Sequence, residues 1–273
     1  MEPDLENQLE FEKLYDKNQL IPRLKREFKD NPEIIAHCEH HEIPFKFAVS
    51  LLVQMVLHKR ANLPTLVGLL HKSFSSPQEC ADMLLKAAQH DLVDYNQFEN
   101  MFIIRINVTQ DVYDELDQYQ YPLPCLIEPK KLTCNRDTGY YGNVTGYGSV
   151  ILQTGNHHDY DVNLDHLNNS NKIPLSINTE VARLVQNKWR NLDGPKPHED
   201  FSKYQQRVKA FNKYDKSSRD IMETLFMMGN KFYLTHKYDK RGRTYPQGYH
   251  VNTQGNPWNK AVIEFHDKEI TTG

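Results

Sequence analysis

Residues 239–246 read Asp-Lys-Arg-Gly-Arg-Thr-Tyr-Pro, and this stretch decides how the rest of the chain is interpreted. It places three cations, one carboxylate and one glycine within five residues. Arginine binds phosphate oxygens through two parallel N–H groups, and glycine lets the main chain approach a phosphate closely. Arg241 and Arg243, which flank Gly242, therefore suit a phosphate backbone. The alternative is a solvated turn between two strands.

Apolar residues flank the cationic loop on both sides. The aromatic run at 232–238 (Phe-Tyr-Leu-Thr-His-Lys-Tyr) leads into it, and residues 254–257 (Gln-Gly-Asn-Pro) form a turn-rich segment after it. Residues 261–265 (Ala-Val-Ile-Glu-Phe) then have the composition of a β-strand. This order predicts strands on either side of a cationic turn.

Composition and charge indicate a globular protein with a polyanion partner. The chain of 273 residues is long enough for one large domain or two smaller ones. Its 15 tyrosines suit interfaces and nucleic acid as well as half-buried surface. The net charge of −3 does not indicate a nucleic-acid-binding protein, but residues 198–260 hold twelve Lys and Arg against six Asp and Glu. This local excess points to a polyanion beside the C-terminal half.

Cysteine usage and hydropathy indicate a cytoplasmic protein. The sequence has no signal peptide and no apolar run that could span a bilayer. The four cysteines show no disulfide framework; they are Cys38, Cys80, Cys125 and Cys134. We therefore expect reduced thiols in a cytoplasm, with no membrane partner.

Helical patterns dominate the first 90 residues. Alternating acids and bases predict one or two solvated helices at 1–30, and further helices are expected at 32–43, 45–59, 64–71 and 77–90. Residues 37–41 (His-Cys-Glu-His-His) offer four potential zinc ligands. Adjacent ligands on one helix cannot close a tetrahedron, so no metal site is expected there.

A β-hairpin is expected at residues 91–106, after the helix at 77–90. This order also fits a winged helix, in which residues 77–90 would read DNA. The only basic side chains in that helix are Lys86 and His90, which argues against direct base reading. A winged-helix regulator is the alternative function.

The middle of the chain is expected to contain a second hairpin and a helix. Spaced glycines from Gly139 onward predict an antiparallel hairpin that continues into residues 150–152. Ser176 is expected to cap a helix that ends near residue 189.

Two more helices are expected after a linker at 194–197. The first is a basic helix at 199–214, and the serine pair at 217–218 is expected to cap the second. Lys216 and Arg219 lie at this junction. The predicted fold class is therefore α+β and mainly helical.

The order of four sequence blocks resembles that of the single-subunit RNA polymerases of bacteriophages and mitochondria. The strongest block is 232–246, which is similar to the family's aromatic strand followed by Asp-aromatic-Arg-Gly-Arg-x-Tyr. The next block, at 252–265, begins Asn-x-Gln-Gly-Asn. Residues 127–141 and 177–181 are similar to two upstream blocks of the family.

This resemblance implies that the loop at 239–245 grips the template strand and the RNA–DNA hybrid in the palm. Arg241 and Arg243 would contact phosphates, and Gly242 would permit close approach. Tyr245 would support the template. Asp239 would hold the loop as a structural partner of the cations.

The resemblance also implies a strand-separating role for the hairpin at 91–106, with Tyr95 and Phe98 stacking on a base. The full set of expected nucleic-acid-binding residues is Tyr95, Phe98, Lys216, Arg219, Lys240, Arg241, Gly242, Arg243, Tyr245, Gln254 and Asn256.

The chain departs from the family pattern at several positions. Lys240 stands where the family has an aromatic residue, and residues 128–132 (Glu-Pro-Lys-Lys-Leu) replace its Pro-Pro-x-Pro-Trp block. The segment between Asn178 and Asp239 is shorter than the family's thumb region.

The sequence ends at Gly273, before the block in which the family carries its first metal-binding aspartate. Phosphoryl transfer needs two magnesium ions held by carboxylates. We therefore expect no catalytic residue and no metal ligand in this chain, and Mg²⁺ held by a second polymerase subunit with the palm aspartates and the fingers. The chain resembles the N-terminal subunit of split, heterodimeric phage members of the family.

Further partners and the domain plan follow from the resemblance. Template DNA and RNA are expected ligands, and an accessory DNA-binding protein is expected to recruit the enzyme to promoters in the bacterial host cytoplasm. The expected segments are a helical N-terminal domain at 1–120, a hairpin and connecting helix at 121–192, reduced thumb-like helices at 193–231 and the start of a palm at 232–273.

Overall fold

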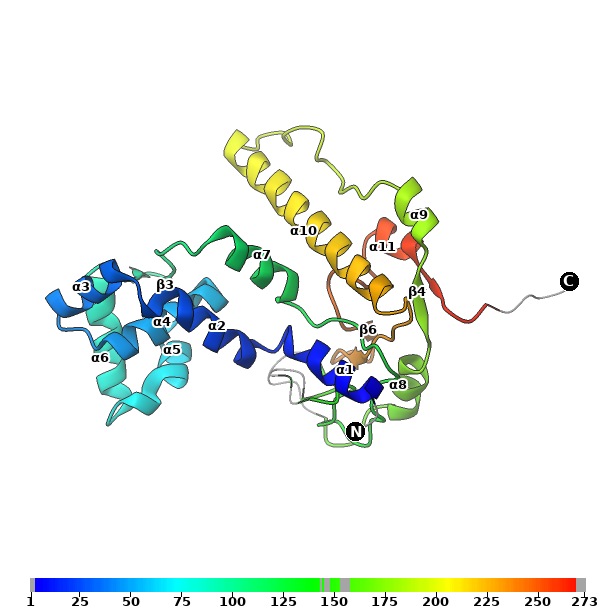
Figure 1. The fold of residues 1–273 in the computed structure, drawn as a ribbon, viewed down its shortest axis with the longest axis horizontal. Helices are drawn as coiled ribbons and strands as arrows, with labels where there is room; N and C mark the ends of the chain where they lie inside the picture. The colour runs from blue at the N-terminus through cyan, green and yellow to red at the C-terminus, as the bar shows by residue number, and fades with distance from the viewer. Residues whose placement is uncertain (1–2, 143, 145–147, 153–157, 269–273) are drawn as a thin grey trace, which may run out of the picture. The chain divides into compact units, whose positions relative to one another are not determined.

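The computed structural model describes residues 3–142, 144, 148–152 and 158–268 (Figure 1). Two compact units divide the chain: unit 1 comprises residues 1–16 and 117–273, and unit 2 comprises residues 17–116. The fold is α+β and mainly helical, as the sequence predicts. The first sixteen residues belong with the C-terminal part, which the sequence-based division at residue 120 did not foresee.

Unit 2 is built from five helices and a small sheet. The helices are α2 (Lys17–Lys29), α3 (Pro32–His40), α4 (Phe45–His58), α5 (Leu63–Leu70) and α6 (Pro77–Gln89). A short 3₁₀ helix, η1 (His71–Ser73), follows α5, and α7 (Gln110–Tyr119) runs from unit 2 into unit 1. Side chains cap three of these helices: the oxygens of Asn31, Asn62 and Ser76 accept backbone N–H groups of the first turn.

The core of unit 2 forms around α4, whose residues from Phe47 to Val56 are buried except Ser50. Its fully buried members include Leu51, Leu52 and Met55. Leu66 of α5 and Leu84 of α6 complete the same cluster. A helix that is apolar on nearly all sides is stable only when other elements surround it, which explains its central position.

The sheet of unit 2 has the strand order β1-β3-β2 and is antiparallel throughout. Its strands are β1 (Arg60–Asn62), β2 (Asp94–Asn96) and β3 (Met101–Ile103). The hairpin predicted at 91–106 is therefore confirmed as β2 and β3, and β1 is an addition. The chain order α4-β1-α5-α6-β2-β3 is that of a winged helix.

Unit 1 is organised around the extended segment 232–238. Phe232 exchanges two backbone hydrogen bonds with Leu175, and Tyr233 exchanges two with Cys125, all between 2.8 and 2.9 Å. Further along, Tyr238 donates to the carbonyl of Val150 and accepts from the N–H of Leu152. One segment therefore pairs with three separate stretches of chain.

Unit 1 contains two short strand pairs. Strand β4 (Leu175–Ile177) pairs with β7 (Ile263–Phe265), and β5 (His236–Tyr238) pairs with β6 (Thr244–Pro246), both antiparallel. The helices of unit 1 are α1 (Pro3–Lys13), α8 (Leu164–Asn171), α9 (Thr179–Leu184), α10 (Phe201–Met227) and α11 (Pro257–Val262). Helix α9 packs beside α11 (Figure 1).

Two buried polar side chains attach α1 to the loops of unit 1. The side-chain oxygen of Gln8 accepts the N–H of Leu126 at 2.6 Å. The carboxylate of Glu12 accepts the N–H groups of Tyr141 and Gly142. Because these donors lie in irregular segments, the α1 side chains satisfy backbone groups that no strand pairs.

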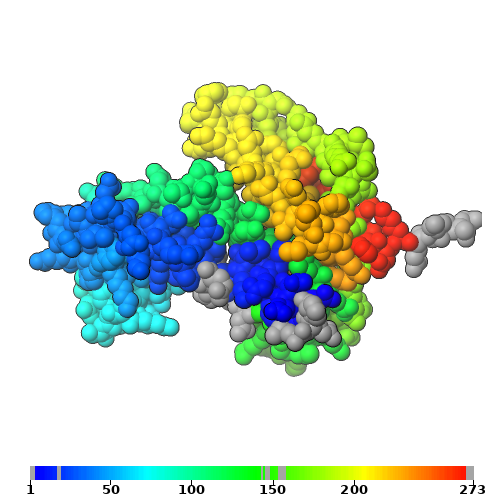
Figure 2. All heavy atoms as spheres, in the orientation of Figure 1, coloured from blue at the N-terminus to red at the C-terminus, as the bar shows by residue number. Residues whose placement is uncertain are grey.

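The two helices predicted at 199–214 and 217–230 are one continuous helix, α10, of 27 residues. Ser217 and Ser218 do not cap a second helix. Both are buried in the middle of α10, and the hydroxyl of Ser218 contacts Nδ1 of His250 at 3.3 Å. A small polar side chain fits at this close contact, which is a tertiary requirement that local cap patterns do not reveal. Figure 2 shows the atoms of α10, yellow to orange, from the top of unit 1 down into its middle.

The helix predicted from Ser176 is also wrong. Ser176 is buried in β4, and Asn178 caps a helix that ends at Leu184. The expected strand at 261–265 is half helix, because α11 extends to Val262 before β7 begins.

The hairpin predicted from Gly139 into 150–152 includes residues 143 and 145–147, which lie outside the described residues. The described residues of this stretch do not form that hairpin. Residues 150–152 pair instead with Tyr238. Gly139 lies against the 232–238 segment, since a Cβ there would stand 2.5 Å from Cγ2 of Thr235.

Cys38, Cys80, Cys125 and Cys134 all carry free thiols. In the described part of the chain, no helix combines the length and the apolar character needed to cross a bilayer.

Asn168 provides a test of the packing in unit 1. Its side chain accepts the N–H of Leu132 at 2.8 Å and donates to the carbonyl of Leu132 at 3.0 Å, in a buried position. We expect Asn168→Ala to lower the free energy of unfolding by about 1–3 kcal/mol, because two buried backbone groups lose their partner. Chemical denaturation measures it. Asn169→Ala, at an exposed neighbouring position of α8, is the control, and an equal effect of both changes would contradict the assignment.

Candidate nucleic-acid interface

The cationic loop connects the two strands of the β5–β6 hairpin. The register pairs His236 with Pro246, Lys237 with Tyr245 and Tyr238 with Thr244. The loop closes with two backbone hydrogen bonds: Asp239 donates to the carbonyl of Arg243, and Gly242 donates to the carbonyl of Asp239. The flanking strands therefore fix both ends of residues 239–243.

The carboxylate of Asp239 holds the loop from inside. Oδ1 accepts the N–H groups of Arg241 at 2.9 Å and of Arg243 at 3.0 Å. Oδ2 accepts Nε of Arg243 at 2.8 Å and the hydroxyl of Tyr245 at 3.4 Å. The hydrogen bond from the Arg243 backbone, together with the Arg243 side chain, lowers the pKa of Asp239.

Gly242 has a φ of +80°, a backbone angle that residues with a Cβ rarely adopt. A Cβ at this position would meet nothing within 4 Å. The requirement for glycine is therefore conformational, and open space lies beside the backbone of the loop.

The two arginines of the loop differ in how tightly they are held. Arg243 is bound by Asp239 through Nε and through Nη2 at 2.7 Å, and its guanidinium lies 5.6 Å from the ring centre of Tyr245. Arg241 approaches Asp239 only at 3.5 Å, and its side chain is 65% exposed. Lys240 is exposed as well. Arg241 and Lys240 are thus the outward cations, and Arg243 supports the loop.

Gln254 and Asn256 have structural contacts. Nε2 of Gln254 donates to the carbonyl of Thr244 at 3.0 Å, which ties the following turn to β6. Asn256 caps α11 by accepting the N–H of Asn259 at 2.8 Å, and its amide donates to Asn187. Gln254 therefore supports the hairpin, and Asn256 supports α11.

The cations of α10 are mostly engaged within the protein. Arg219 pairs with Asp215 at 3.1 Å and lies 5.2 Å from the ring centre of Trp258. Lys213 pairs with the buried carboxylate of Asp117. Lys216 lies exposed on the same helix.

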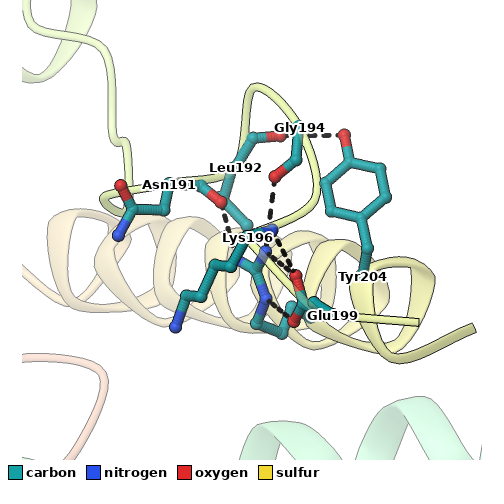
Figure 3. A network of polar contacts seen from close by, with 7 residues as sticks. Asn191, Leu192, Gly194, Lys196, Glu199 and Tyr204 are labelled. Atoms are coloured by element: carbon teal, nitrogen blue, oxygen red, sulfur yellow. Dashed lines mark hydrogen bonds and ion pairs between the residues drawn. The ribbon is translucent and has the colours of Figure 1, made fainter. Parts of the chain in front are cut away.

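A polar network holds the segment before α10 (Figure 3). Arg207 binds Glu199 through Nε and Nη2, both at 2.7 Å, and donates through Nη1 to the carbonyl of Asn191. Glu199 also accepts the N–H of Lys196, and the hydroxyl of Tyr204 donates to the carbonyl of Leu192. The pKa of Glu199 is lowered to about 2, and the main cause is the hydrogen bond from the Arg207 side chain.

Tyr95 and Phe98 lie in unit 2, whereas the other predicted residues lie in unit 1. The Tyr95 ring packs 4.5 Å from that of Phe102, and its hydroxyl donates to Asn100. Phe98 occupies the turn between β2 and β3 and is fully exposed. Of these two aromatics, Phe98 is the one that can stack on a base.

The described residues do not fit a magnesium site. Among them, no group of three or more His, Cys, Asp and Glu side chains is placed to hold a metal ion. Both oxygens of Asp239 already accept hydrogen bonds from N–H donors. A carboxylate in this state is a partner for cations on the protein.

No protein-family model matches the chain, and a search of curated proteins finds no similar one.

His236, at the start of β5, links the hairpin to α8. Its Nδ1 lies 2.9 Å from the side-chain oxygen of Asn171, and burial lowers its pKa to about 4. The folded chain therefore keeps this ring neutral, while the unfolded chain takes up a proton below about pH 6.5.

We expect the free energy of unfolding to fall as the pH drops from about 6.5 towards 4, by at most about 3 kcal/mol from this group. The sign follows because the unfolded state binds more protons in this range. His236→Asn, which retains a donor near Nδ1, should flatten the profile in denaturation at pH 7 and 5. The exposed His198→Asn is the control, and a slope unchanged in His236→Asn would contradict the assignment.

Proposed function

We propose that this chain is a subunit of a DNA-directed RNA polymerase that grips template DNA and the RNA–DNA hybrid and works with a second, catalytic subunit. The architecture of the loop at 239–245 carries this proposal. A carboxylate fixes the turn, a glycine opens its backbone, and Arg241 and Lys240 extend into solvent. Such a rigid cationic turn binds phosphates with little loss of conformational entropy.

The contacts among the blocks that resemble the polymerase family also support the proposal. Gly139 packs on Thr235. Asn178 caps α9 and donates to Glu264 of β7 at 2.8 Å. Segments far apart in the sequence thus meet around residues 232–246, where one shared site would require them.

In the proposed complex, the partner chain would hold the magnesium ions that promote phosphoryl transfer. The residues of this chain bind and orient nucleic acid. An accessory DNA-binding protein would recruit the complex to promoters in the cytoplasm of a bacterial host.

Co-expression with the neighbouring reading frame tests the proposal. We expect a stable heterodimer that extends an RNA primer on a DNA template only when both chains are present. Extension by the partner alone at the same rate, or a complex that binds no primed template, would refute the assigned role.

The loop should act through its outward cations. We expect Arg241→Ala to weaken binding of an RNA–DNA hybrid and to reduce the slope of log affinity against log salt by about one, because one phosphate contact is lost. Arg243→Lys should lower retention of short transcripts in the heterodimer, since a point charge cannot replace the fork on Asp239. Salt titrations of hybrid binding measure the first effect. Lys188→Ala, elsewhere in unit 1, is the control, and an unchanged slope in Arg241→Ala would exclude the phosphate contact.

A DNA-binding regulator of the winged-helix type is the second candidate, because unit 2 has the element order and sheet order of that fold. The surface of α6 argues against it. The exposed side chains of this helix include Glu79 and Asp82, which repel phosphates, and Leu85. Specific duplex binding by the full chain without any polymerase partner would favour the regulator.

Substitution of the exposed Phe98 should have different effects under the two candidate functions. If the β2–β3 turn separates strands, Phe98→Ala should slow initiation on duplex templates several-fold more than on single-stranded ones, because base stacking contributes about 1–3 kcal/mol. Leu85→Ala, an exposed apolar change on α6, is the control. Equal slowing on both templates would exclude the strand-separating role.

A further inference from the structure

A pair of stacked tyrosines stands on the surface of unit 1, outside the cationic loop. The rings of Tyr121 and Tyr249 lie 4.5 Å apart with an interplanar angle of 29°. Their residues are 37% and 43% exposed. Each ring therefore buries one face against its neighbour while part of the pair is open to solvent.

A glycine turn brings the two tyrosines together. Gly248 has a φ of +110°, and a Cβ there would stand 2.9 Å from the carbonyl of Val251 and 3.4 Å from that of Pro122. Its own carbonyl accepts the side-chain amide of Asn252 at 2.8 Å. This close approach places Tyr249 beside Tyr121, the residue before Pro122.

A buried histidine and an α10 tyrosine support the pair from below. His250 is buried, lies 5.1 Å from the ring of Tyr249 and 5.9 Å from that of Tyr121, and stacks on Tyr214 at 5.7 Å. Tyr214 also meets the edge of Tyr249 at 5.3 Å. Burial lowers the pKa of His250 to about 4, so the ring beneath the pair is neutral at physiological pH. The rings are fixed before any ligand arrives, which lowers the entropic cost of stacking on them.

Several lysines lie on α10, the helix that carries Tyr214. Lys209, Lys213 and Lys216 are exposed and recur at spacings of four and three residues, which places them on one face of the helix. Lys213 precedes Tyr214 and pairs with Asp117, whose residue lies four positions before Tyr121. This ion pair offsets the charge of the Asp117 carboxylate. The acids on the adjacent part of α10 are Asp215, paired with Arg219, and Asp220.

We propose that Tyr121 and Tyr249 form a stacking platform for an unpaired nucleobase, and that the lysines of α10 hold the phosphates on either side of it. The ligand class is single-stranded nucleic acid. Aromatic faces accept any base, and a row of cations follows the backbone, which is the combination that binds single strands without sequence preference. The proposal rests on the proposed function only for the origin of the strand, as template DNA or as transcript.

Binding of labelled 12-mers to the full chain tests the platform. The probes are oligothymidylate, oligouridylate and an abasic strand with the same number of phosphates. We expect Tyr249→Ala to weaken binding of both base-containing strands about tenfold, the effect of one lost stacking contact, and Tyr249→Phe to bind as the wild type. The abasic strand should bind all of these proteins equally.

Tyr160→Ala, at a tyrosine that is 86% exposed and outside the platform, is the matched control. Lys209→Ala should reduce the salt slope for all three probes alike. Equal affinities of Tyr249→Ala and the wild type for the base-containing strands would overturn the proposal, as would an equal loss on the abasic strand.

A crosslinking experiment covers the case in which Tyr249→Ala fails to fold. Irradiation of wild-type chain bound to a 5-bromouridine-containing strand should attach the base to Tyr249 or Tyr121, as read by mass spectrometry. Adducts confined to other residues would overturn the platform. Stronger binding of the RNA probe would identify the transcript as the strand, and stronger binding of the DNA probe would identify the template.

The outcomes separate this site from the proposed function. A reconstituted heterodimer that makes no RNA, while the base-dependent binding persists, would refute the polymerase role and leave the platform in place. An active heterodimer that responds to Arg241→Ala, with no base-dependent binding at Tyr249, would refute the platform alone.

Discussion

The backbone hydrogen bonds of residues 232–238 hold unit 1 together. This segment pairs with Leu175 at its start, with Cys125 one residue later and with Val150 and Leu152 at its end. Phe232 is fully buried. These partners come from three separate stretches of chain, so a change in the register of this segment would disrupt several contacts at once. The cationic loop inherits its position from this arrangement, because β5 is the continuation of the same segment.

The loop shows how one carboxylate can organise several cations. Asp239 neutralises Arg243 and fixes two backbone N–H groups, so the local charge is less positive than the sequence suggests. What remains available to a polyanion is Arg241, Lys240 and the open backbone at Gly242. Asp239 and Arg243 make the loop rigid, whereas Arg241 and Lys240 supply its outward charge. Arg241 and Arg243 therefore have different roles.

Local patterns predicted the helices of unit 2 and the β2–β3 hairpin, because caps such as Asn31 and Ser76 and the apolar face of α4 act within one element. The strands and loops of unit 1 depended on long-range pairing. Ser176 resembles a cap and lies in β4, and Ser218 resembles a cap and lies inside α10 against His250. In the candidate site, the sequence predicted a cationic loop held by Asp239, but it did not distinguish Arg241 from Arg243. The contact between Tyr121 and Tyr249 depends on the turn at Gly248, and no local pattern in the sequence predicts it.

The cationic excess at residues 198–260 is a poor guide to the binding surface. Arg207 is bound to Glu199, Lys213 to Asp117 and Arg219 to Asp215, so much of the positive charge on α10 stabilises the fold. An ion pair already formed with a protein carboxylate must be broken or shared before it can hold a phosphate, and this competition lowers its contribution to binding. Affinity for a polyanion therefore depends on where cations lack tight carboxylate pairing and where aromatic faces lie beside them. In the described part of unit 1, Arg241 with Lys240 meets the first condition, and the stacked rings of Tyr121 and Tyr249, in contact with Tyr214 of α10, supply exposed aromatic surface.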